Sequence, residues 1–71
     1  MKIRYSKHAI ERMKERGISR NGIKEILLKG QKRGFQSDGS IKCVYSKKAE
    51  KITVIYYQEK ENFKIITAYK I

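Results

Sequence analysis

The spacing of apolar residues divides the chain into a helical first part and a second part made of strands. Up to about residue 29 the apolar positions recur every three or four residues, which is the period of a helix. From residue 31 onward they tend to alternate with polar ones, as in a β-strand. We therefore predict an α+β domain in which two helices precede the sheet.

Each predicted helix lies between a serine and a glycine. Ser6 can cap a helix running to about Arg16, because its hydroxyl can accept hydrogen bonds from the free amides of the first turn. Gly17 follows where a left-handed C-terminal cap is favoured. Ser19 begins a second helix in the same way, and Gly30 ends it. The sequence thus predicts two short helices joined by a tight turn.

Four strands are predicted after the helices. They cover residues 32–36, 41–46, 51–58 and 63–69. The pair Asp38-Gly39 is typical of a hairpin turn between the first two. The third strand carries apolar residues on both faces, which indicates a central position in the sheet. The expected architecture is a four-stranded antiparallel meander with the two helices packed on one of its faces.

The same periodicities predict which side chains form the core. Four positions expected to be buried are Ile10, Met13, Ile26 and Val54. Cys43 shares its strand face with Ile41 and Tyr45, so we interpret it as a core residue rather than a reactive thiol. Adjacent strand residues point to opposite faces, and one of Tyr56 and Tyr57 could therefore stack on an unpaired base while the other packs inside.

Length and charge change the picture by indicating a polyanionic partner. The 71 residues make one domain (residues 1–71), and 18 basic against seven acidic side chains give a net charge of +11. All five arginines lie in the first half of the chain: Arg4, Arg12, Arg16, Arg20 and Arg33. The planar guanidinium matches phosphate oxygens, so we expect a nucleic-acid partner. The alternative is a basic face that serves only solubility.

Several classes of protein are not favoured. No apolar run approaches the roughly 20 residues of a membrane span, and no such run follows the charges at the N-terminus, so we expect a cytoplasmic protein without membrane contact. One histidine and one cysteine without paired spacing predict no metal site. We expect no cofactor.

The first helix carries the most specific local pattern. His8, Arg12 and Arg16 follow one another at intervals of four residues and therefore form one stripe beside the apolar stripe. Histidine is the side chain that exchanges a proton most readily near neutral pH. The alternative is that these are ordinary surface charges. The residues expected to contact nucleic acid are Arg4, Lys7, Arg16, Arg20, Arg33 and Tyr57.

Two stretches resemble a known family. The first is His8–Ser19, with eight matching positions: His8, Ala9, Arg12, Met13, Arg16, Gly17, Ile18 and Ser19. It resembles the front motif of domain-of-unknown-function family 4258, a group of small bacterial and archaeal proteins. Residues Ile65–Tyr69 look like the closing strand of that family. The resemblance covers nearly the whole chain.

That family in turn looks similar to the RelE-like and colicin-like ribonuclease toxins. The resemblance implies two helices on a curved antiparallel sheet and cleavage of RNA without a metal, by attack of a 2′-hydroxyl on the adjacent phosphate. It implies His8 as acid or base, Arg12 and Arg16 near the scissile phosphate, and a hydrogen bond or a proton from Thr67 and Tyr69. The implied partners are RNA, including ribosome-associated mRNA, and an antitoxin protein.

RelE-like toxins usually take their catalytic groups from the sheet, whereas His8 lies on a predicted helix. A non-catalytic nucleic-acid-binding protein that uses the same arginine-rich face is therefore the alternative function.

Overall fold

A computed structural model describes residues 2–70 as two helices and a five-stranded sheet. The elements are β1 (Lys2–Tyr5), α1 (Lys7–Arg16), α2 (Arg20–Lys29), β2 (Gln31–Phe35), β3 (Ile41–Lys47), β4 (Glu50–Glu59) and β5 (Asn62–Lys70). The strand order is β1-β5-β4-β3-β2. The predicted α+β class is thus confirmed, and β4 is the central strand as expected.

Both helices begin and end where the sequence predicts. The hydroxyl of Ser6 accepts a hydrogen bond from the backbone amide of Ala9 at 3.0 Å, and Gly17 adopts a left-handed conformation with φ of 66°. The hydroxyl of Ser19 accepts from the amide of Gly22 at 2.9 Å. Each serine satisfies one of the amides that the first turn of its helix leaves without a backbone partner.

The prediction of four antiparallel strands is wrong in one respect, because β1 is a fifth strand. It pairs with β5 in parallel and makes the sheet mixed. The signal in the sequence is a single short alternation, in which Ile3 and Tyr5 pack against the core while Lys2 and Arg4 do not. Four residues are too few for that period to stand out beside the helix signal that follows.

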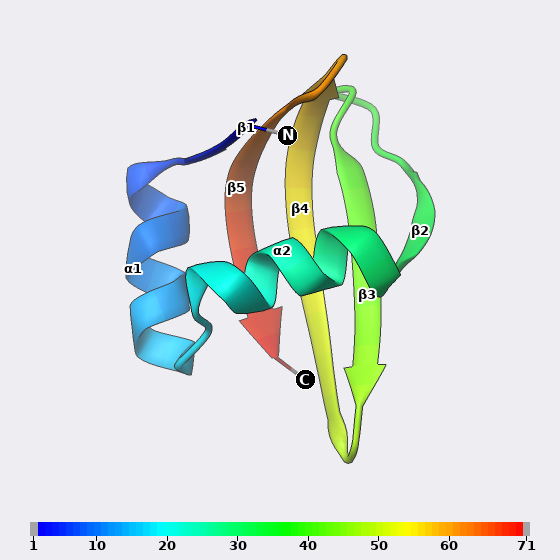
Figure 1. The fold of residues 1–71 in the computed structure, drawn as a ribbon. Helices are drawn as coiled ribbons and strands as arrows, with labels where there is room; N and C mark the ends of the chain where they lie inside the picture. Colours follow the sequence, from blue (N-terminus) through cyan, green and yellow to red (C-terminus); the bar gives the residue numbers. More distant parts are fainter. Residues whose placement is uncertain (1, 71) are drawn as a thin grey trace.

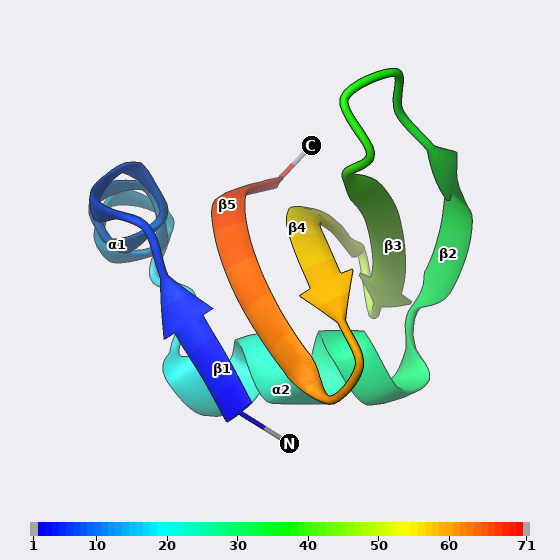
Figure 2. The same cartoon turned by 90° about the horizontal axis from the view of Figure 1, so that it is seen from above.

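The two helices do not share one face of the sheet, contrary to the prediction. In Figure 1, α2 crosses one face of the strands, whereas α1 runs alongside β5. Figure 2 shows that α1 lies at the edge of the curved sheet, beyond β1. Ser6 holds this junction: its amide donates to the carbonyl of Ile65 at 3.0 Å and its hydroxyl to that of Ile66 at 2.9 Å. One face of the sheet is therefore left without a helix.

The core lies between α2 and the face of the sheet that it crosses, and it extends to α1 at the edge of the sheet. Met13, Ile26, Val54 and Cys43 are buried as predicted. Ile10 is not, because 46% of it is exposed. The buried stripe of α1 is centred on Ala9 and Met13, and Ile10 lies about 100° around the helix from Ala9.

Gly30 joins α2 to β2 at a place without room for a side chain. A Cβ atom there would lie 2.6 Å from the carbonyl oxygen of Ile26 and 2.7 Å from the Sγ of Cys43. We expect Gly30→Ala to lower the free energy of unfolding by about 1–3 kcal/mol, since one of these groups must move. Chemical denaturation measures the loss. Combining it with Cys43→Ala should recover part of the stability, and a Gly30→Ala protein as stable as the parent would contradict the assignment.

No helix within residues 2–70 is both long and apolar enough to cross a membrane.

Candidate nucleic-acid interface

The face of the sheet away from α2, here called the open face, carries the side chains that alternate with the core residues. On β5, Ala68 belongs to the core, so its neighbours Thr67 and Tyr69 point to the open face. The cross-strand pairs between β4 and β5 on this face are Thr53 with Tyr69, Ile55 with Thr67 and Tyr57 with Lys64. The open face thus presents two of the predicted catalytic residues side by side.

Part of the open face is closely packed even though no helix covers it. Thr53 is 0% exposed and Val44 is 8% exposed, and the two are directly paired between β3 and β4. Neither can be covered by α2, because both alternate with residues of the core cluster. The middle of the open face is therefore shielded from solvent although no helix lies over it.

One flank of α1 borders the open face. Ala9 and Met13 turn toward β5, and α2 lies on one side of α1 (Figures 1 and 2). A right-handed helix in this orientation carries Ile10 on the side of α2. The opposite flank, with His8, Arg12 and Arg16, then lies toward the open face. We call these three residues the α1 flank.

Hydrogen bonds order the α1 flank. The Nε of Arg12 donates to the Nε2 of His8 across 3.4 Å, and the Nη1 of Arg12 pairs with the Oε2 of Glu15 at 3.0 Å. The arrangement therefore places an imidazole, a group that can exchange a proton, beside a cation that can neutralise an anionic group.

Tyr57 is the exposed aromatic residue of the open face. Its ring is 40% exposed, and its hydroxyl donates to the Oδ2 of Asp38 at 3.1 Å. This hydrogen bond raises the pKa of Tyr57. The pKa of Asp38 is lowered, chiefly because the hydroxyl of Ser40 donates to it at 2.6 Å. The turn after β2 thus holds the phenol ring at a fixed place, and Tyr56 points the opposite way into the core, as expected.

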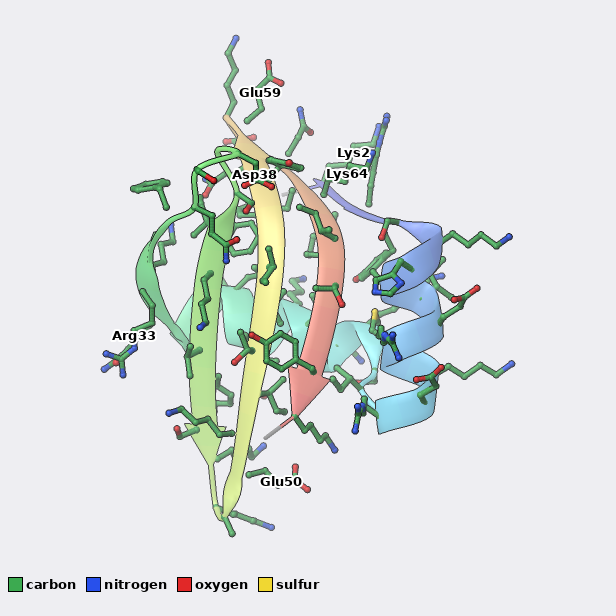
Figure 3. The ribbon with its side chains drawn as sticks, turned by 180° about the vertical axis from the view of Figure 1, so that it is seen from behind. Lys2, Arg33, Asp38, Glu50, Glu59 and Lys64 are labelled. Atoms are coloured by element: carbon green, nitrogen blue, oxygen red, sulfur yellow. The ribbon has the colours of Figure 1, made fainter. Side chains whose placement is uncertain are left out.

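Other predicted contacts lie away from this surface. Arg20 begins α2, where its guanidinium stands 5.0 Å from the ring of Tyr5 on the core side of β1. Arg33 is at the far edge of the sheet from α1 (Figure 3). Lys7 follows the cap of α1 about 100° around the helix from His8, outside the α1 flank. The structure therefore does not bring these three together with His8.

Arg4, another predicted contact, does lie on the open face, together with two lysines that sequence reasoning missed. Arg4 and Lys2 alternate with the core residues of β1, and Arg4 is paired directly with Lys64 of β5. Figure 3 shows Lys2 and Lys64 next to each other at the start of β5. The alternation of basic and apolar residues at positions 2–5 is the signal that could have revealed them.

The chain belongs to the family described as "Domain of unknown function (DUF4258)", whose profile matches residues 5–70. The family resemblance found in the sequence is thereby confirmed. Comparison with curated proteins and with solved structures yields no match.

Proposed function

We propose that this chain is a RelE-like, metal-independent ribonuclease that cleaves RNA by transphosphorylation. The observation that carries the proposal is the position of the α1 flank, which sets an imidazole and two guanidinium groups beside a sheet face bearing Thr67 and Tyr69. An acid or base, cationic groups for the phosphate and further donors thus come from two adjacent elements.

In the proposed reaction, the 2′-oxygen of one nucleotide attacks the adjacent phosphorus. His8 would take the proton of the 2′-hydroxyl once the Nε of Arg12, which donates to the Nε2 of His8 in the structure, has turned to the phosphate. The bond between phosphorus and the 5′-oxygen breaks, and that oxygen receives a proton from the phenol of Tyr69. The products are a 2′,3′-cyclic phosphate and a 5′-hydroxyl. His8 is left protonated and Tyr69 ionised, and proton exchange with water restores both.

Arg12 and Arg16 would bind the phosphate while negative charge builds up on its oxygens. The pair of Arg12 with Glu15 lies at an exposed position, where such a pair is worth little. A phosphate can therefore compete with Glu15 for the guanidinium at small cost. The side chain of Thr67 would donate a further hydrogen bond from the floor of the site.

The net charge of the chain supports the choice of substrate. A value of +11 on 71 residues attracts polyanions over long distances and raises the rate of encounter with RNA. As a toxin, the protein would also need an antitoxin that holds this activity in check, and an acidic segment is the partner that the same charge favours.

The direct test is incubation of the purified protein with defined single-stranded RNAs in the presence of a chelator. We expect cleavage that leaves 2′,3′-cyclic phosphate and 5′-hydroxyl ends. Cleavage only after addition of Mg²⁺, or products with 5′-phosphates, would show the mechanism to be wrong.

A second candidate is a nucleic-acid-binding protein without catalysis. The observation that favours it is the exposure of His8 on the helix surface, where water can reach the imidazole from several directions. If saturating RNA is bound by the protein but is never cleaved, the non-catalytic function is supported.

A further inference from the structure

A hollow of about 350 Å³ at the β1 end of the open face has no role in the chemistry described above. Its lining residues come from three neighbouring strands: Lys2, Arg4, Tyr57, Glu59, Asn62, Phe63 and Lys64. Three are cations, against the single carboxylate of Glu59. The hollow therefore combines positive charge with an exposed aromatic ring.

The positions of the cations in the hollow lower the stability of the fold, because two of them face each other. Arg4 and Lys64 are direct partners across β1 and β5, and like charges in such a pair destabilise a sheet. Lys2 is two residues from Arg4 and shares its face. Within residues 2–70 none of the three forms an ion pair, whereas Arg12, Lys47 and Lys70 do. An anion bound between Arg4 and Lys64 would relieve this repulsion.

The ring of Tyr57 lies beside these cations, and a hydrogen bond restrains it. Tyr57 is paired with Lys64 across β4 and β5, and its hydroxyl is tethered to Asp38. Figure 3 shows Asp38 and Lys64 at this same end of the sheet. The tether leaves the ring exposed, so that it can stack on a planar group with little loss of freedom.

Cations bind a phosphate, and an exposed aromatic ring stacks on a planar base. A nucleotide carries both groups. We propose that the hollow is a subsite for one unpaired nucleotide of single-stranded RNA, whose base stacks on Tyr57 and whose phosphate is bound by Arg4 and Lys64. This deepens and rests on the proposed function, since the subsite would hold RNA that extends from the α1 flank.

The distance along the sheet suits one continuous strand of RNA. Thr67 is paired with Ile55, and Ile55 is two residues from Tyr57 on β4. Two residues of a strand span about 7 Å. The base on Tyr57 would therefore belong to a nucleotide near the one whose phosphate lies by Thr67.

The subsite is tested by binding, in a His8→Ala background in which cleavage is slow enough that little RNA is lost during the measurement. Fluorescence anisotropy would compare single-stranded and duplex RNA oligonucleotides of equal length. We expect Tyr57→Leu to weaken single-strand binding roughly 5- to 150-fold, the range found for loss of one stacked base, with a much smaller effect on duplex. Tyr57→Phe keeps the ring and should keep most of the affinity.

Phe35→Leu is the matched control, because Phe35 is 80% exposed on β2, outside the hollow. It should bind like the parent. Arg4→Gln should reduce the slope of log affinity against log salt by about 0.7 on single strands, the contribution of one phosphate contact. Equal affinities for Tyr57→Leu and Phe35→Leu, or equal losses on single strand and duplex, would overturn the subsite.

The outcomes also separate the subsite from the proposed function. If RNA is cleaved but Tyr57→Leu binds it normally, the ribonuclease stands and the subsite is wrong. If RNA is never cleaved but binding depends on Tyr57, the subsite belongs to a non-catalytic protein. If the chain binds no RNA, both proposals fail.

Discussion

Replacing His8 by alanine is expected to lower the rate of metal-independent RNA cleavage about 10²- to 10⁴-fold, which is the usual contribution of one general acid or base. The side chain is exposed and lies at the start of α1, so its loss should leave the fold intact. The measurement is the rate of cleavage at saturating RNA with chelator present, together with thermal unfolding of both proteins.

Two further variants on α1 make this result interpretable. Lys14→Ala removes an exposed charge from outside the α1 flank and should cleave RNA almost as fast as the parent. Arg12→Ala should weaken both binding and turnover, because a phosphate contact serves the ground state and the transition state alike. A His8→Ala protein that cleaves at the parental rate would remove His8 from the mechanism.

Ile26→Ala is expected to destabilise the domain by about 2–5 kcal/mol, through the loss of buried surface and the cavity left behind. Ile26 is 2% exposed in the middle of α2 and belongs to the core cluster. Since a domain of this size has a total stability of about 5 kcal/mol or slightly more, the loss is a large part of the whole. Chemical denaturation monitored by circular dichroism measures it.

The matched control is the same substitution at Ile10, which is 46% exposed on α1. Ile10→Ala removes much less buried surface than Ile26→Ala and replaces a β-branched residue by the best helix former, so its effect should be clearly smaller. Equal losses at both positions would contradict the packing of the two helices described above.

Local signals in the sequence predicted the helices well because each boundary has its own chemistry. Ser6 and Ser19 cap in the expected manner, and Gly17 supplies the left-handed residue. Pairing between distant segments has no such signal. β1 becomes a strand only because β5 offers a free edge to pair with, and four residues with two apolar positions do not indicate a partner some 60 residues away.

The candidate site was predictable along α1 and less so on the sheet. Spacing alone placed His8, Arg12 and Arg16 on one stripe of the helix. On β5 a register shift leaves Ile66 unpaired, since Thr67 is paired with Ile55 and Ile65 with Tyr56. Strict alternation would put Lys64 and Thr67 on opposite faces, whereas the bulge brings both to the open face. A register shift of this kind cannot be read from periodicity.

The pairing of β1 with β5 affects when the protein acquires its site during translation. Ser6 and Ile66, which join α1 to β5, are 60 residues apart in the chain. At roughly 5–20 residues per second, a ribosome needs about 3–12 s to make the intervening segment. Until then α1 has no edge of β5 to pack against, and its histidine and arginines are not positioned beside Thr67 and Tyr69. In a growing chain these residues therefore stay apart, and they come together only when β5 pairs with β1.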